Sequence, residues 1–376
     1  MRIPRIYDNL DQYLKPNKVV VIYGPRQVGK TTLLKHFLSQ TSLKYRFDSG
    51  DNIRIQNLLG SQDFNKIIEY AQGYDLIVID EAQRIKDIGH GLKILVDNSA
   101  ELQIIATGSS SFELAGQIGE PLTGRKITLT LYPISFIELS ELYNKYDLKE
   151  KLEEFLIFGF YPEVITTENR TKKIRIIDEL VNSYLLKDIL ELDKVKSSKI
   201  LLDLLRLIAF QIGKEVSLSE LAQKLGIDYK TVARYLDLLE KTFIIRSLRG
   251  FRRNLRIELT KKAKYYFFDT GIRNALIANF NSFDLRNDIG MLWENFLFIE
   301  RLKKQQYHSI YANNYFWRTW SQKEIDFIEE RDGKLYGFEF KWNVKKKVKV
   351  PKEWIGNYPE SEFSVITPDN FLDIVI

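Results

Sequence analysis

The chain has 376 residues, of which 44% are hydrophobic, 13% aromatic and 28% charged. This length exceeds what one hydrophobic core usually serves, so roughly two or three globular domains are expected. The absence of cysteine excludes disulfides, thiolate zinc sites and cysteine nucleophiles, and only three histidines are available for metal or triad chemistry. Any metal ion should therefore be a hard cation held by oxygen ligands.

The apolar segments and the charge limit the partners of the chain. No stretch approaches the ~18 apolar residues of a membrane span, and the first residues lack the apolar segment of a secretion signal. We therefore expect a soluble, cytoplasmic chain with no membrane partner. The net charge is +6, and residues 1–200 hold 27 basic and 27 acidic side chains, against 29 and 23 in residues 201–376. A polyanionic partner should therefore meet the second half first.

Five short apolar runs alternate with helical patterns between residues 18 and 132, and turn residues bound each run. This alternation is typical of an α/β domain with a mainly parallel sheet. The predicted strands are KVVVIYG (18–24), KYRF (44–47), DLIVID (75–80), LQIIATG (102–108) and KITLTLY (126–132).

The segment GPRQVGKT, residues 24–31, follows the first run and opens a helical pattern. A strand, a G-x-x-x-x-G-K-[ST] loop and a helix in this order indicate a phosphate-binding loop for ATP. Gly24 and Gly29 would let backbone N–H groups face the phosphates, Lys30 would reach the β- and γ-phosphates, and the Thr31 hydroxyl would coordinate Mg²⁺. The residues expected to hold the nucleotide are Gly24, Pro25, Arg26, Gln27, Val28, Gly29, Lys30, Thr31 and Thr32.

Polar residues also end two of the other runs. Asp80 ends DLIVID, where a carboxylate can hold Mg²⁺, and Glu81 next to it is the natural general base for a water that attacks the γ-phosphate. The run LQIIATGSS ends in Thr107, Ser109 and Ser110, whose hydroxyls can position that water, and Ser109 is assigned to the nucleotide site. The alternative for these hydroxyls is an ordinary turn.

The strand signals stop after residue 135, and residues 136–195 show helical spacing. The segment SLSELAQKLGIDYKTVARYLDLLEKT then has a helix-turn-helix pattern, and a basic hairpin follows it. This order predicts a winged-helix module that contacts DNA. The candidate DNA-binding residues are Lys230, Arg234, Arg249, Arg252 and Arg253. The alternative is that this module only docks the ATPase onto the C-terminal domain.

Two predicted strands near the C-terminus carry acidic residues and a lysine. Strand alternation puts Glu324, Asp326 and Ile328 on one face of EIDFIEE, with Ile325 and Phe327 on the other, and Glu339 and Lys341 share a face of FEFKW. Asp326 and Glu339 could hold Mg²⁺ or Mn²⁺ against a scissile phosphate, while Lys341 serves the attacking water. Glu294, on a preceding helix, would complete the site. The alternative is an amphipathic sheet whose exposed face is merely charged.

The chain resembles the AAA+-type P-loop ATPases of bacteria and archaea that carry a fused C-terminal domain likened to PD-(D/E)XK nucleases. The segments that carry the resemblance are GPRQVGKTTLL, LIVIDEAQ, IIATGSSS, LTGRKITLTLYPISFIEL, GFYPEV and YFFDTGIRNAL. The resemblance implies that Arg125 is a sensor or finger for the γ-phosphate, in its own subunit or a neighbour's. Glu294, Asp326, Glu339 and Lys341 match the nuclease pattern, although Ile325 replaces the usual proline.

Together these features predict an α/β chain of four units. They are an AAA+-like P-loop NTPase core with a parallel sheet (1–135), a helical lid (136–195), a winged-helix module (196–255) and an α/β PD-(D/E)XK-like domain (256–376). The expected function is ATP hydrolysis coupled to action on DNA, with metal-dependent cleavage by the last unit and a possible homo-oligomer through the first. The alternative is a nucleotide-controlled switch or DNA-binding regulator that does not cut.

Overall fold

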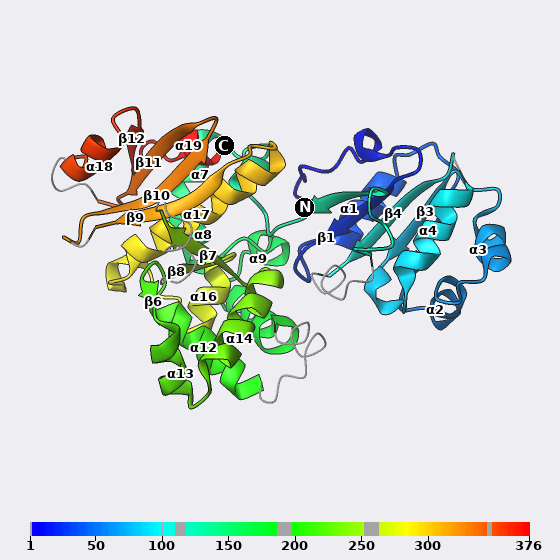
Figure 1. Ribbon diagram of the computed structural model, residues 1–376, viewed down its shortest axis with the longest axis horizontal. Coiled ribbons are helices and arrows are strands. Elements are labelled where there is room, and N and C mark those ends of the chain that lie inside the picture. The colour runs from blue at the N-terminus through cyan, green and yellow to red at the C-terminus, as the bar shows by residue number, and fades with distance from the viewer. Residues whose placement is uncertain are drawn as a thin grey trace.

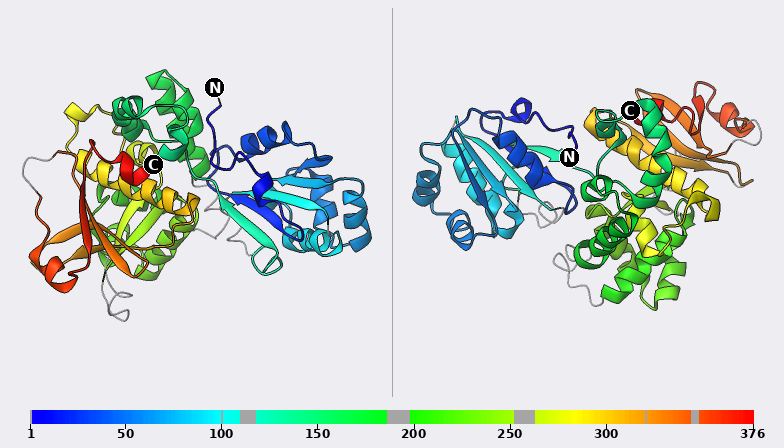
Figure 2. Two further views of the ribbon diagram at one scale, coloured as in Figure 1. Left: turned by 90° about the horizontal axis from the view of Figure 1, so that it is seen from above. Right: turned by 180° about the vertical axis from the view of Figure 1, so that it is seen from behind.

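The computed structural model describes residues 2–99, 101–109, 118–185, 198–251, 263–319, 321–343 and 348–376. They form two lobes, each built on one β-sheet, which lie side by side in every view (Figures 1 and 2). The first lobe holds the N-terminal third of the chain, and the second lobe holds the rest. None of the helices in the described ranges is long and apolar enough to cross a membrane.

The first lobe contains a five-stranded parallel sheet in the order β2-β3-β4-β1-β5. This confirms the predicted strands and the parallel α/β architecture. Parallel strands place all their carboxyl ends at one edge, so residues that follow different strands meet there. The strands are β1 (Val19–Tyr23), β2 (Tyr45–Ser49), β3 (Leu76–Asp80), β4 (Gln103–Gly108) and β5 (Lys126–Thr130).

Helices cover both faces of this sheet because successive strand residues point to opposite sides. Val20 and Ile22 pack in one core cluster with Leu33 and Leu34 of α1, whereas Val19 belongs to the other, with residues of α2, α3 and α4. The helices are α1 (Lys30–Leu38), α2 (Ile53–Leu59), α3 (Phe64–Ala71) and α4 (Ile88–Asn98), with short 3₁₀ turns at Asp11–Tyr13 and Ala82–Arg84.

The second lobe begins with short helices, as the helical spacing predicts. Ser135 caps the first of them, because its hydroxyl accepts a bond from the Glu138 N–H while the Glu138 carboxylate accepts from the Ser135 N–H. The helices are α6 (Phe136–Leu139), α7 (Lys145–Glu150), α8 (Leu152–Phe158), α9 (Pro162–Thr166) and α10 (Arg170–Glu179), followed by a π-helical segment, Leu180–Leu185.

The next helices form a helix-turn-helix. Gly226 ends the second helix in the left-handed conformation (φ 66°), and the Asp228 carboxylate accepts the Thr231 N–H to start the third. The elements are α12 (Ser198–Phe210), β6 (Glu215–Val216), α13 (Leu218–Leu225), α14 (Tyr229–Lys241), β7 (Ile245–Gly250) and β8 (Ala263–Phe267). Arg252 and Arg253, two of the predicted DNA contacts, lie outside the described residues.

One seven-stranded sheet, in the order β12-β11-β10-β9-β7-β8-β6, joins this hairpin to the C-terminal strands. Strand β7 pairs in parallel with β9 through Arg249 and Gly250, so the predicted unit border at residues 255 and 256 falls inside a continuous sheet. The remaining elements are α16 (Thr270–Leu276), a 3₁₀ turn (Phe283–Leu285), α17 (Ile289–Tyr307), β9 (Asn313–Arg318), β10 (Glu324–Arg331), β11 (Lys334–Phe340), α18 (Lys352–Asn357), β12 (Glu362–Ile366) and α19 (Leu372–Val375).

The alternation predicted for residues 324–328 is wrong. The pairing of β10 with β9 shifts register between Ile325 and Ile328, which is the mark of a bulge. As a result, Ile325 and Ile328 pack in the same small core cluster, whereas Phe327 packs in the main cluster against Phe298 and Phe338.

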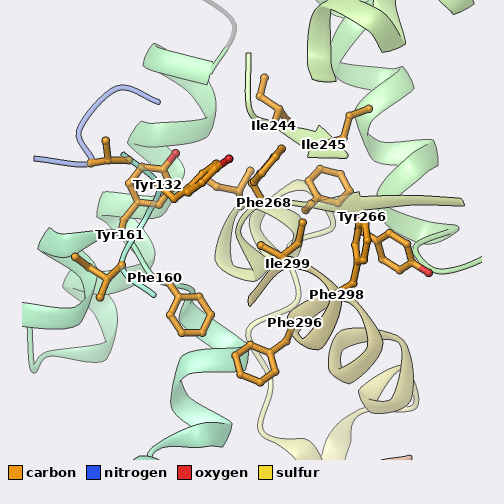
Figure 3. Close-up of a cluster of buried hydrophobic side chains, with 14 of the residues drawn as sticks. Tyr132, Phe160, Tyr161, Ile244, Ile245, Tyr266, Phe268, Phe296, Phe298 and Ile299 are labelled. Atoms are coloured by element: carbon orange, nitrogen blue, oxygen red, sulfur yellow. The ribbon is translucent and has the colours of Figure 1, made fainter. Parts of the chain in front are cut away.

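An aromatic cluster lies where the two lobes meet (Figure 3). Tyr132, which follows β5, stacks on Phe268 with 5.7 Å between ring centroids and also contacts Phe243 and Tyr307. Phe243 in turn lies 5.8 Å from Tyr23, the residue just before the phosphate loop. The hydrophobic core therefore continues from the first lobe into the second lobe.

A second joint connects two of the segments that carry the family resemblance. The buried Asp269 carboxylate, in YFFDTG, accepts the Phe160 N–H of GFYPEV at 2.6 Å and the Ile272 N–H at 3.0 Å. Gly159 has φ 81°, and a Cβ there would lie 2.2 Å from the Asp269 carboxylate. Glycine is thus required at this close approach.

Arg5 is a buried ion-pair residue that binds both lobes. Its guanidinium donates to the Glu138 carboxylate at 2.8 Å, to the Val28 carbonyl of the phosphate loop at 2.5 Å and to the Tyr132 carbonyl at 2.7 Å. The side chains of Arg5 and Glu138 are only 6% and 1% exposed. A buried pair of this kind cannot lose one partner without leaving an uncompensated charge.

We expect Arg5→Met to lower the free energy of unfolding by about 4 kcal/mol, because Glu138 would stay buried without its counter-charge. Urea denaturation of the full chain measures this. The control is Arg2→Met, which removes the more exposed pair with Asp8 and should change stability by less than about 1 kcal/mol. Equal losses for the two variants would contradict the role assigned to Arg5.

Candidate functional site

The loop between β1 and α1 has the backbone shape that the sequence pattern predicts. Gly24 has φ 154°, and a Cβ there would lie 2.0 Å from the Leu131 carbonyl oxygen. Gly29 has φ 94° and caps α1 in the left-handed region. Larger residues at these two positions would therefore be strained. Residues 24–29 form a tight turn that opens directly onto the N-terminus of α1.

Lys30 lies against its own loop. Its ammonium donates to the carbonyls of Gly24 and Pro25, each at 2.9 Å, and the residue is 5% exposed. Of the other predicted loop residues, Val28 is buried, Arg26 is half-buried, and Gln27 and Thr32 are exposed. The structure thus brings the predicted nucleotide-binding residues together on one turn.

Thr31 and Asp80 meet at the carboxyl edge of the sheet, as the parallel topology requires. The Thr31 hydroxyl donates to Asp80 Oδ2 at 2.7 Å, and the Thr107 hydroxyl donates to Asp80 Oδ1. Hydroxyl and carboxylate oxygens are ligands that Mg²⁺ prefers, so this pair fits a magnesium ion next to the loop.

Glu81 follows Asp80 in the left-handed conformation, with φ 51°. Its N–H donates to the Thr107 hydroxyl at 3.2 Å, and its carboxylate accepts from the Gln83 amide at 2.6 Å. The other amide atom, Gln83 Oε1, is buried without a hydrogen-bond partner among the described residues. Sequence reasoning missed Gln83, although its place two residues after Glu81 could have drawn attention to it. Ser109 is fully buried after β4, and Ser110 lies outside the described residues.

Arg125 lies at the amino ends of the parallel strands, whereas the phosphate loop lies at their carboxyl ends. It precedes β5, its carbonyl accepts the Val19 N–H at the start of β1, and its side chain pairs with Asp97 at 2.5 Å. The phosphate loop follows the far end of β1, and a five-residue strand spans about 16 Å. Arg125 therefore cannot reach the loop of its own chain.

The predicted DNA contacts that the structure describes are on the surface. Lys230 and Arg234 lie on the exposed face of α14, and Arg249 is exposed on β7. Val232, Tyr235, Leu236 and Leu239 are buried on the inner face of the same helix. The three cations therefore belong to one part of the second lobe, formed by α14 and the strand that follows it.

The structure brings the predicted acidic residues and Lys341 of the C-terminal strands together. It adds Lys264, which the sequence pattern did not include. Lys341 Nζ lies 2.6 Å from Glu339 and 3.9 Å from Asp326, and the Phe340 N–H donates to Asp326 at 2.8 Å. Lys264 Nζ lies 2.9 Å from Glu294 and 2.5 Å from Glu324. These six residues, Lys264, Glu294, Glu324, Asp326, Glu339 and Lys341, are called the carboxylate cluster below.

Burial raises the pKa of Glu294 to about 7, although the Lys264 ammonium beside it favours the ionised form. Burial also raises the pKa of Asp326 and of Glu339. Burial alone would lower the pKa of Lys264, but Glu294 and Glu324 raise it above its ordinary value. The cluster borders a cavity of about 450 Å³, lined in part by Glu294, Asp326 and Lys341.

In the part of the chain that the structure describes, no group of three or more histidine, aspartate or glutamate side chains is arranged to hold a metal ion. Asp326 and Glu339 therefore offer two carboxylates. Mg²⁺ keeps several water ligands and often binds proteins through one or two carboxylates, so such a pair still fits one hard cation.

Family models match three successive parts of the chain. Residues 16–140 match an AAA domain, residues 149–283 match a domain of unknown function (DUF8612), and residues 289–370 match another domain of unknown function (DUF4143). The second match extends beyond the predicted winged-helix border at residue 255.

Relatives with similar sequences occur in bacteria and archaea. An uncharacterized protein of Mycobacterium tuberculosis is 28% identical over 86% of this chain and 70% of its own length. An uncharacterized protein of Haemophilus influenzae is 27% identical over 98% of this chain and 90% of its own. One from Methanocaldococcus jannaschii is 24% identical, over 84% and 73% of the two chains.

Among the solved structures that match this chain is a Walker-type ATPase of Pyrococcus abyssi, with a TM-score of 0.45 and 16% identity over 69% of this chain and 91% of that one. RuvB of Thermotoga maritima has a TM-score of 0.30 and 20% identity over 61% and 82%. The loop geometry and the match to the AAA domain lead to one conclusion: the first lobe is a nucleotide-binding P-loop domain of the AAA ATPase type.

Proposed function

We propose that this chain binds and hydrolyses ATP in its first lobe and couples that reaction to action on DNA by its second lobe. The observation that carries the ATPase part is the 2.7 Å contact of Thr31 with Asp80 beside the phosphate loop. The proposed division into functional units follows the sequence borders: ATPase core (1–135), helical lid (136–195), winged helix (196–255) and nuclease-like domain (256–376).

The loop N–H groups of residues 24–32 would bind the phosphates, with Lys30 turning from its loop carbonyls toward the β- and γ-phosphates. Thr31 and Asp80 would hold Mg²⁺, which neutralises charge on these phosphates when bound. Glu81 would accept the proton of the attacking water, and Gln83 supports this role because its amide fixes the Glu81 carboxylate. Ser109 would help to position the same water.

Arg125 would act as a finger in a neighbouring subunit. We assign Arg125 to the site of a neighbouring subunit and not to its own, because it lies at the end of its own sheet that is far from the phosphate loop. Its side chain is 40% exposed. The proposal therefore includes a homo-oligomer through the first lobe. An arginine that reaches the γ-phosphate across such an interface stabilises the charge of the transition state.

We expect Lys30→Ala to abolish ATP binding, because the change removes the cation that faces the β- and γ-phosphates. Glu81→Gln should bind ATP normally but lose hydrolysis, because the amide cannot take the proton of the water. Isothermal titration with a non-hydrolysable ATP analogue and a phosphate-release assay measure the two properties. Equal hydrolysis by the parent and Glu81→Gln would remove Glu81 from the base role.

The proposed contact with DNA rests on charge and exposure. Lys230, Arg234 and Arg249 are exposed on α14 and β7, and the excess of basic residues lies in the second half of the chain. Arg252 and Arg253 continue this basic segment in the sequence. Cations on a recognition helix and the adjoining hairpin are suited to a duplex backbone.

Replacing Lys230, Arg234 and Arg249 together by glutamine should weaken DNA binding and flatten its salt dependence. Each lost phosphate contact removes about 0.9 from the slope of log K against log salt, so the triple variant should lose about 2.7. Fluorescence anisotropy at several salt concentrations gives the slope. A matched control replaces three exposed lysines of the first lobe, Lys15, Lys35 and Lys66, and should leave the slope unchanged. The same slope in all three proteins would show that α14 and β7 do not contact DNA.

A second candidate function is metal-dependent cleavage of DNA by the carboxylate cluster. The specific support is the close approach of Lys341 to Glu339 and Asp326. Asp326 and Glu339 would bind Mg²⁺ or Mn²⁺, and Lys341 would serve the water that attacks the phosphate. The competing function is a nucleotide-controlled, DNA-binding switch that does not cut.

Any cleavage should stop in EDTA and in each of the variants Asp326→Asn, Glu339→Gln and Lys341→Ala. The first two variants should also weaken Mn²⁺ binding, whereas Lys341→Ala should keep the ion and lose the reaction. Plasmid nicking and metal titration test both parts, with Glu330→Gln on the same strand as control. An uncut plasmid with the parent protein and either metal would favour the switch.

A further inference from the structure

Lys264 is a buried cation in the middle of the carboxylate cluster. It lies on β8, between β7 and β6 in the sheet, and its side chain is 2% exposed. Its ammonium contacts Glu294 at 2.9 Å and Glu324 at 2.5 Å, and it lies 5.3 Å from the centroid of the Phe316 ring. A lysine buried this deeply needs compensating carboxylates, and these two residues supply them.

The cluster contains two lysines, and each serves two carboxylates. Lys264 lies between Glu294 and Glu324, while Lys341 lies beside Glu339 and Asp326. The lysines differ in their freedom to move. Lys341 is 38% exposed at the end of β11, so its ammonium can turn into the cavity, whereas Lys264 is enclosed by the sheet.

Glu294 is held by the same arrangement. Its Oε1 atom accepts the Tyr266 hydroxyl at 2.5 Å as well as the Lys264 ammonium. Tyr266 is fully buried two residues after Lys264 on the same strand and packs on Phe298 of α17 (Figure 3). Two fixed donors therefore occupy one oxygen of this carboxylate.

We propose that Lys264 takes the place of a second metal ion, so that the cluster accepts one divalent cation, at Asp326 and Glu339. This inference rests on the cleavage function proposed above and specifies its metal requirement. A divalent ion at Glu294 Oε1 and Glu324 Oε1 would have to displace the Lys264 ammonium, because that ammonium contacts both oxygens and the two cations repel each other. Glu294 and Glu324 are then positioning residues for Lys264, and neither is a metal ligand.

The test is the number of Mn²⁺ ions bound by the full-length chain, measured by electron paramagnetic resonance. Every protein carries Asp80→Asn, which weakens binding at the ATPase site. The parent should bind one ion in the second lobe, Asp326→Asn should bind none, and Lys264→Gln should bind two, because Glu294 and Glu324 would no longer share an ammonium ion.

The outcomes separate this inference from the function on which it rests. One ion in the parent and one in Lys264→Gln would overturn the role of Lys264, and so would two ions in the parent. If the parent binds no ion and Lys264→Gln binds one, the cleavage site fails while the exclusion by Lys264 is supported. No ion in either protein overturns both.

If Lys264→Gln does not fold, a second variant, Glu324→Gln, still tests the proposal. Glu324→Gln keeps Lys264 and changes a side chain that is 28% exposed. It should still bind one Mn²⁺ with unchanged affinity, because Glu324 contacts the ammonium and not the ion. A loss of Mn²⁺ affinity of ten-fold or more in Glu324→Gln, with unchanged circular dichroism, would overturn the proposal.

Discussion

The buried guanidinium of Arg5 is the contact on which the relation between the two lobes depends. It binds the phosphate loop at the Val28 carbonyl, the end of the first sheet at the Tyr132 carbonyl, and the second lobe at Glu138. All of these partners are removed from water, so no bond can be exchanged for a solvent contact. A shift of the Val28 carbonyl therefore costs Arg5 a bond unless residues 132–138 move with the loop. This is a direct physical link between the proposed nucleotide site and the start of the second lobe.

The aromatic cluster and the Asp269 joint complete that link. Tyr132 connects the end of β5 to Phe268, and Asp269, the next residue, binds the Phe160 N–H. Two short segments that are more than a hundred residues apart in the sequence thus form one contact. Both segments are among those that carry the family resemblance, and the structure shows what joins them. Gly159 leaves room for the Asp269 carboxylate, which accepts the Phe160 N–H.

The parallel sheet of the first lobe could be predicted from the sequence, whereas the second lobe could be predicted only in part. Apolar runs bounded by turn residues located β1 to β5, and the rule that parallel strands end at one edge predicted the meeting of Thr31 with Asp80. Lys264 was missed because its partners, Glu294 and Glu324, come from elements whose neighbourhood depends on the order of strands in the sheet. The available signal was a lysine directly before the apolar run YYFF. The bulge in β10 could not be predicted, because the alternation rule assumes a constant register along the strand.

The continuous seven-stranded sheet has a mechanical consequence. Strand β7 follows α14 and pairs with β9, which pairs with β10 on both sides of the bulge, so a ladder of backbone hydrogen bonds runs from the helix-turn-helix to the strand that carries Asp326. Paired strands resist relative motion, so we expect these parts to move together and any nucleotide-driven hinge to lie outside that ladder. If α14 holds a duplex, the sheet fixes the distance between that duplex and the carboxylate cluster. We expect this distance to be the same with or without ATP. The nucleotide could then decide when the second lobe engages DNA, while the sheet decides where along the DNA the cluster falls.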